Sequence, residues 1–227
     1  MNKHRFLSLL LAGILAGIIA LSAVVMSGCT NHQAPAMGEL DFTAVDASKC
    51  VETNEVTDLV KISIKDYGDV IVRLYPGVAP ETVANFQDLV SEHFYDGLTF
   101  HRVMINFMIQ TGDPKGDGTG GSSNHIKGEF SSNGFENNLK HIRGVLSMAR
   151  RSDDMNSASS QFFIVHQTNS STTNLNGDYA SFGYVVSGMD VIDAIAKTPV
   201  KNSSTGEKSV PVTPVVIDTA RFVKIAE

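Results

Sequence analysis

The chain of 227 residues has a formal net charge of -6, with 42% hydrophobic and 19% charged residues. This composition supports the core of one or two globular domains and excludes a chain that is disordered throughout. It contains no long run of lysine and arginine, which argues against a nucleic-acid-binding surface. Two cysteines, Cys29 and Cys50, are too few for a disulfide framework.

Residues 1–28 have the pattern of an export signal. Lys3 and Arg5 precede an uncharged apolar stretch over residues 7–26, which is typical of a secretory signal peptide. The two small residues that follow stand directly before Cys29 and resemble a bacterial lipobox. That resemblance implies that Cys29 is acylated and becomes the mature N-terminus. About 20 apolar residues can also span a bilayer, so an uncleaved membrane anchor is the alternative, and both interpretations export the rest of the chain.

Residues 29–57 are predicted to form a tether. Small and polar residues dominate this segment, and only its end suggests a short strand. Lipidation of Cys29 would leave Cys50 as a single thiol. We expect the tether to hold a globular domain, residues 58–227, away from the membrane.

The predicted domain opens with a hairpin and a helix. Apolar and polar residues alternate on both sides of a turn near Gly68, which predicts a β-hairpin over residues 59–75. Pro80 and Glu81 then suit a first helical turn, and apolar residues recur at helical spacing. These features predict a helix over residues 80–93.

Short strands dominate the remainder of the domain. A second helix is predicted over residues 188–199, where Pro199 ends it. Many short strands with only two helices favour an all-β barrel or sandwich. The further strands are predicted at residues 99–104, 107–111, 145–149, 161–166, 181–186 and 215–225.

Four motifs occur in order along this domain: FHRVMINFMIQTGD at 100–113, GDGTGG at 116–121, GVLSMAR at 144–150 and NSASSQFFIV at 156–165. Together they resemble the cyclophilin family of peptidyl-prolyl cis-trans isomerases, over residues 59–227. The resemblance implies a mainly β fold, a closed eight-stranded antiparallel β-barrel capped by two α-helices. It also implies an isomerase that needs no metal and no cofactor.

The resemblance further implies the site residues. Arg102 would be catalytic, because a fixed guanidinium can hydrogen-bond the proline nitrogen when the X-Pro bond is twisted and its resonance is lost. Gln110 would bond the substrate backbone and help to orient Arg102. The other implied substrate-binding residues are the pocket walls Phe107, Met108, Phe163 and Leu175, together with Ala149, Arg150 and Tyr179.

Other interpretations compete with these. Without the motif, Arg102 would be interpreted as an ion-pair partner and its apolar neighbours as core residues. Only the motif favours the catalytic and pocket roles instead. GDGTGG matches the dinucleotide-binding pattern G-x-G-x-x-G, but no helical period follows it. Histidines at 93, 101, 125, 141 and 166 lack zinc-ligand spacing with the cysteines.

The sequence therefore predicts an exported isomerase, lipid-anchored through Cys29 at the extracytoplasmic face of a bacterial membrane. We expect a monomer that acts on proline-containing unfolded or partly folded polypeptides and binds no nucleic acid. The alternative is a proline-peptide binding module or holdase without turnover. The chain has no Trp, and the family's cyclosporin-contacting tryptophan would fall near Asn174. We expect weak cyclosporin A binding, which a dissociation constant below about 100 nM would contradict.

Overall fold

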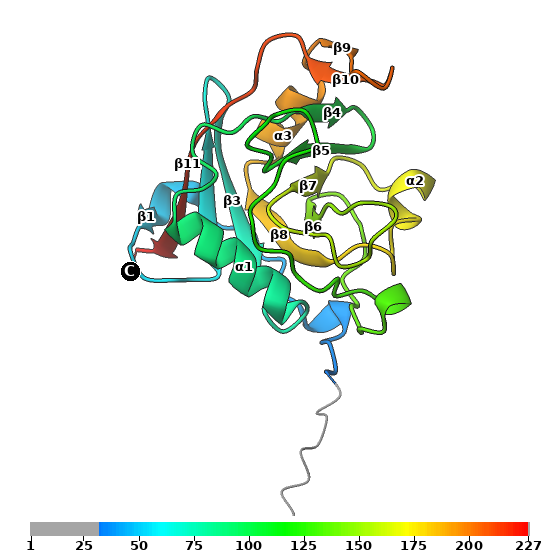
Figure 1. Cartoon of the computed structure of the whole chain (residues 1–227). Coiled ribbons are helices and arrows are strands. Elements are labelled where there is room, and N and C mark those ends of the chain that lie inside the picture. The colour runs from blue at the N-terminus through cyan, green and yellow to red at the C-terminus, as the bar shows by residue number, and fades with distance from the viewer. Residues whose placement is uncertain (1–31, 227) are drawn as a thin grey trace, which may run out of the picture. The chain divides into compact units, whose positions relative to one another are not determined.

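The computed structural model describes residues 32–226, which form one compact unit built on a nine-stranded antiparallel sheet (Figure 1). The predicted signal peptide and Cys29 lie outside the described residues. Neighbouring strands follow the order β1-β11-β2-β3-β8-β6-β7-β5-β4, and β9 pairs separately with β10. The strands are β1 (Cys50–Glu52), β2 (Leu59–Ile64), β3 (Gly68–Leu74), β4 (Arg102–Met104), β5 (Met108–Thr111), β6 (Val145–Met148), β7 (Phe162–Val165), β8 (Ser181–Ser187), β9 (Val200–Asn202), β10 (Lys208–Pro211) and β11 (Ile217–Ile225).

The predicted hairpin is confirmed as β2 and β3. Val60 lies opposite Val72, and Ile62 lies opposite Val70. Because side chains alternate across a strand, these four residues share the buried face of the pair. A cluster of aromatic rings completes the core, with Phe86 packed edge-on against Phe162 at 5.3 Å between ring centroids.

The sheet curls round without closing into the predicted eight-stranded barrel. Its hydrogen-bonded ladder ends at β4 on one side and, on the other, at the short strand β1, which pairs with β11. Three backbone hydrogen bonds nevertheless link the segment before β4 to the start of β11. They run from Phe100 N to Val215 O (2.9 Å), from Ile217 N to Leu98 O (2.8 Å) and from Gly97 N to Ile217 O (2.8 Å).

Three α-helices accompany the described sheet, where two were predicted. Helix α1 (Pro80–Ser91) and helix α3 (Met189–Ala196) match the predicted pair. Helix α1 packs near β11, whereas α3 packs near β3, β4 and β5. The additional helix, α2 (Ser170–Thr173), is a single turn capped by the side chain of Asn169. Short 3-10 turns occur at Met37–Glu39, Ala47–Lys49 and Ser131–Asn133.

The described part of the predicted tether lies against the domain. The carbonyl of Asp41 accepts hydrogen bonds from Arg73 Nη1 (2.9 Å) and Tyr75 Oη (2.7 Å). Further along, Val45 N donates to Val186 O (3.0 Å), and Cys50 begins β1 as a half-buried free thiol. Among residues 32–226, no helix is long and apolar enough to cross a membrane.

Candidate active site

A groove of about 400 Å³ opens at one side of the sheet. Strands β4, β5, β7 and β10 supply part of its lining, and the rest comes from His101 and from the loops that follow β4, β5, β6, α2 and β9. All nine residues predicted for the site line it: Arg102, Phe107, Met108, Gln110, Ala149, Arg150, Phe163, Leu175 and Tyr179.

Strand pairing places the polar residues of the groove next to each other. Arg102 on β4 lies directly opposite Gln110 on β5, and Gln110 lies opposite Phe163 on β7. Directly opposite residues in an antiparallel pair share one face of the sheet. Their neighbours Val103 and Ile109 form the next pair, and both are fully buried in the core. The alternation explains how an arginine occurs within an apolar stretch, since it points to the other face.

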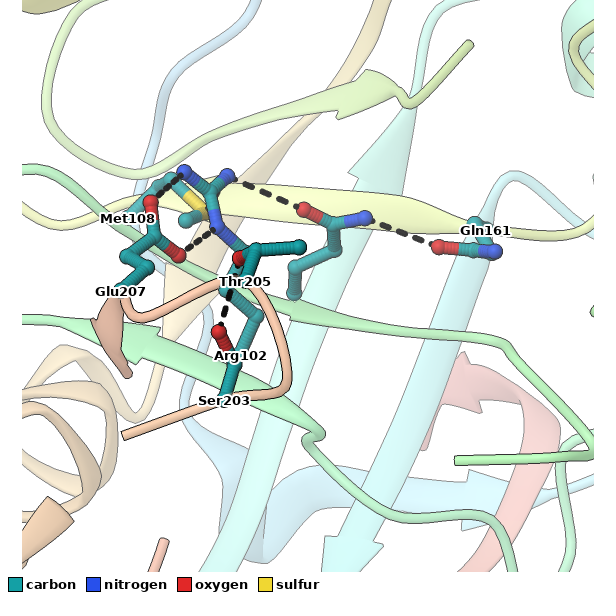
Figure 2. Close-up of polar contacts among 7 residues, drawn as sticks. Arg102, Met108, Gln161, Ser203, Thr205 and Glu207 are labelled. Carbon is teal, nitrogen blue, oxygen red and sulfur yellow. Dashed lines mark hydrogen bonds and ion pairs between the residues drawn. The ribbon is translucent and has the colours of Figure 1, made fainter. Parts of the chain in front are cut away.

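The guanidinium of Arg102 is held mainly by a carboxylate. Glu207, in the loop between β9 and β10, accepts from Nε at 2.6 Å and from Nη2 at 2.7 Å (Figure 2). Nη1 faces Gln110 Oε1 at 3.4 Å and Met108 Sδ at 4.0 Å. The hydrogen bonds from Arg102 hold the pKa of Glu207 below its ordinary value, which favours the carboxylate form of Glu207.

Gln110 belongs to a second chain of contacts. Its Nε2 donates to Gln161 Oε1 at 2.8 Å (Figure 2). The amide of Gln161 in turn donates to the carbonyls of Gly118 (3.1 Å) and Gly120 (2.7 Å). The glycine-rich loop therefore buttresses the groove, and no helix follows it as a dinucleotide site would require.

Apolar side chains form the other wall of the groove. Phe163 is buried and meets Tyr179 edge-on at 5.9 Å between ring centroids. The guanidinium of Arg150 stacks over Tyr179 at 4.8 Å and donates to the carbonyl of Asp178 at 2.9 Å. Leu175 packs against the core from the loop after α2. These apolar side chains thus line the same groove as the guanidinium of Arg102.

Among the residues that sequence reasoning missed are Glu207, which lines the groove, and Gln161, which bonds Gln110. Glu207 is 105 positions from Arg102, and no local pattern links them. Gln161 lies within a recognised motif, yet nothing in the sequence assigned it a partner. Arg102 is also an ion-pair partner, as the alternative interpretation of the sequence expected. Within residues 32–226 no cluster of His, Cys, Asp and Glu could hold a metal ion.

Comparisons with known proteins agree with this geometry. Residues 59–222 match the family described as cyclophilin type peptidyl-prolyl cis-trans isomerase/CLD. Peptidyl-prolyl cis-trans isomerase B of Bacillus subtilis is 43% identical over 144 residues, which are 63% of this chain and 89% of the relative. A probable peptidyl-prolyl cis-trans isomerase of Brucella suis is 40% identical over 166 residues, 68% of this chain and 79% of the relative.

A solved structure is similar as well. The crystal structure of a Cryptosporidium parvum cyclophilin type isomerase, determined in the presence of the dipeptide Ala-Pro, has a TM-score of 0.62 and 31% sequence identity. The similarity covers 72% of this chain and 98% of that one. Fold, motifs and groove agree, and the chain therefore belongs to the cyclophilin-type peptidyl-prolyl cis-trans isomerases, enzymes that accelerate rotation about X-Pro peptide bonds.

Proposed function

We propose that Arg102 is the main catalytic residue of this isomerase. Resonance holds the X-Pro bond planar behind a barrier of roughly 18–20 kcal/mol. When the bond twists, the proline nitrogen regains its lone pair and accepts a hydrogen bond. A guanidinium aimed at that nitrogen stabilises the twisted form more than either planar form, and only such differential binding accelerates the reaction.

The position of Arg102 supports this role. Its Nη1 end faces Gln110 and the Met108 sulfur, while Glu207 accepts from Nε and Nη2. A substrate proline in the pocket formed by Phe107, Met108, Phe163 and Leu175 would bring its nitrogen beside that end. Gln110 would bond the substrate backbone near Arg102, and the segment Ala149–Arg150, with Tyr179, would bind the flanking residues.

The observation that carries the proposal is the pairing of Arg102 with Gln110 in a groove that apolar side chains also line. The test measures exchange of an X-Pro tetrapeptide by NMR, with the wild-type protein and with Arg102→Ala. We expect the catalysed rate to fall at least about tenfold, or about 1.4 kcal/mol of transition-state stabilisation, while circular dichroism stays unchanged. A protein that binds the peptide without accelerating exchange would instead be a proline-peptide binding module.

We also propose that the enzyme is exported and lipid-anchored through Cys29, and that it assists the folding of proteins outside the cytoplasm. The charged start, the apolar stretch and the small residues before Cys29 support this proposal. Uncatalysed X-Pro exchange takes tens of seconds or longer, which is slow enough to limit folding. Any spacer would be short, since His32 already stacks on Phe135 at 4.2 Å between ring centroids.

The anchor is tested by substitution of its attachment site. We expect Cys29→Ser, expressed in a bacterium that processes lipoproteins, to lose the mass of the lipid. An uncleaved apolar anchor predicts instead that the wild-type protein keeps residues 1–28 with an unmodified mass, and that the substitution removes no lipid. Mass spectrometry of the wild-type N-terminus separates the two outcomes.

A further inference from the structure

The loop between β9 and β10 presents a carboxylate to the groove. Gly206, at φ +87°, and two backbone hydrogen bonds make this loop a tight turn: Ser203 N donates to Glu207 O (2.8 Å), and Gly206 N donates to Ser203 O (3.0 Å). The hydroxyls of Ser203 and Thr205 add a contact of 2.9 Å (Figure 2). These hydrogen bonds order the turn, and they therefore fix the position of Glu207 at its end.

Glu207 fixes the plane of the Arg102 guanidinium. A carboxylate that accepts from both Nε and Nη2 defines the orientation of the planar fork, which a single hydrogen bond does not. The other polar contacts of this guanidinium are weak, at 3.4 Å to Gln110 and 4.0 Å to the Met108 sulfur. The side chain of Arg102 is 33% exposed, so without Glu207 it would have room to swing into solvent.

The edge of the guanidinium that Glu207 binds matters as much as the strength of the contact. The bidentate pair uses Nε and Nη2, whereas Nη1 points toward Gln110 and the sulfur of Met108, a residue that lines the groove. A carboxylate on the Nη1 side would compete with a substrate. On the Nε side it instead holds the opposite end of the guanidinium toward the pocket.

We propose that Glu207 is a positioning residue of the isomerase, which acts through Arg102 by locking its guanidinium toward the proline pocket. The proposal rests on the catalytic role given to Arg102. The contact has two opposite effects on catalysis. The carboxylate partly neutralises the positive charge of the guanidinium, which weakens it as a donor, but it also fixes the direction of the guanidinium. Because a displacement of about 1 Å can cost up to 100-fold in rate, we infer that orientation dominates.

The test is a double-mutant cycle on the full chain, kept soluble in a non-ionic detergent. It compares the catalysed exchange of an X-Pro tetrapeptide for wild type, Glu207→Ala, Arg102→Ala and the double variant. We expect Glu207→Ala to lose about tenfold in rate. We expect no further loss when the same change is made in the Arg102→Ala background, because the carboxylate then has nothing to position. A purely structural effect of the turn would lower the rate equally in both backgrounds.

A conservative variant of Glu207 and a control variant at a neighbouring residue test whether the effect is specific. Glu207→Gln keeps one acceptor oxygen and should retain more activity than Glu207→Ala. Lys208→Ala removes an exposed charge from the same hairpin without touching the groove, and should leave the rate unchanged. In NMR spectra, the Arg102 Nε–H signal should be shifted and slow to exchange in wild type, and averaged in Glu207→Ala.

The possible failures are distinct. If Arg102→Ala is slow but Glu207→Ala matches wild type, the positioning role is wrong and the role of Arg102 stands. If Glu207→Ala is faster than wild type, the contact inhibits the enzyme, which also overturns the proposal. If Arg102→Ala retains the full rate, the catalytic role of Arg102 fails, and the positioning role fails with it.

Discussion

Gln161 sets the orientation of a neighbouring amide. Its Oε1 accepts from Gln110 Nε2, because its own amide nitrogen is committed to the carbonyls of Gly118 and Gly120. Gln110 must therefore turn its oxygen toward Arg102. The opposite orientation of either amide would bring two donors or two acceptors together, and such unpaired polar groups are costly in a partly buried site.

We expect Gln161→Leu to lower the catalysed exchange rate about three- to tenfold with little loss of stability. The variant frees the Gln110 amide to turn, and this weakens its contact with Arg102 by the cost of one hydrogen bond, about 0.5–1.5 kcal/mol. The matched control is Gln87→Leu, since Gln87 donates to Thr57 O at 3.0 Å far from the groove. Equal rates in the two variants would exclude the orienting role.

For single residues, the sequence predicted which side chains within motifs line the groove. It did not predict which distant residues contact them. Arg102 and Gln110 stand eight positions apart in one predicted strand pair, so their proximity follows from local pairing. Glu207 contacts Arg102 because of the turn between β9 and β10, and neither the periodicity nor the motifs predicted that turn. In the sequence, an acid within a polar loop has no feature that distinguishes it from a solvated charge.

Elements with a regular pattern were predicted well. Helix α1 begins at Pro80 as expected and ends at Ser91, two residues early, because His93 adopts a left-handed backbone at φ 57°. The elements that were missed are short and partly exposed. The short strand expected near the end of the tether is β1, at Cys50–Glu52. Strand β9 was missed, because its three residues show no alternation of buried and exposed positions and its pairing depends on a partner strand.

The start of α1 shows how a long-range contact completes a local signal. Ala79 occupies the N-cap position and has no side chain that can cap the helix. Glu129 supplies the acceptor instead, with its carboxylate bonded to the backbone N–H of Glu81 (3.0 Å) and Thr82 (2.8 Å). A negative group at this end also interacts favourably with the helix dipole. The sequence identified where the helix begins, but the residue that caps it lies almost fifty positions away.

For the whole molecule, charge contributes little to the choice of substrate. The chain carries a net charge of -6, yet the groove holds both signs, with Arg102 and Arg150 near Asp117 and Glu207. A mixed lining gives no extended field of one sign to steer a charged partner. We infer that the groove selects for the apolar proline ring and for hydrogen bonds to the backbone, which suits polypeptides of any charge.

Acid conditions act on the molecule through a buried histidine. His141 is almost fully buried, and burial lowers its pKa to about 4. Its ring contacts Asn176 Oδ1 at 3.0 Å and Ser147 Oγ at 2.9 Å, which suits the neutral form. In the unfolded chain an ordinary histidine has a pKa of about 6.5. Between these two values the unfolded state binds more protons than the folded state does, so the folded state loses stability as the pH falls.

We expect the free energy of unfolding to be nearly constant between about pH 7 and pH 8 and to fall between about pH 6.5 and pH 4. The loss from His141 approaches about 3 kcal/mol at the acid end, at about 1.4 kcal/mol for each unit of pKa difference. His101 and His166, whose pKa values burial also lowers, act in the same direction. Urea unfolding at a series of pH values measures the slope, which His141→Gln should reduce without abolishing. A free energy of unfolding that stays constant or rises on acidification over this range would contradict the prediction, since neutral burial of His141 requires the unfolded state to take up the proton.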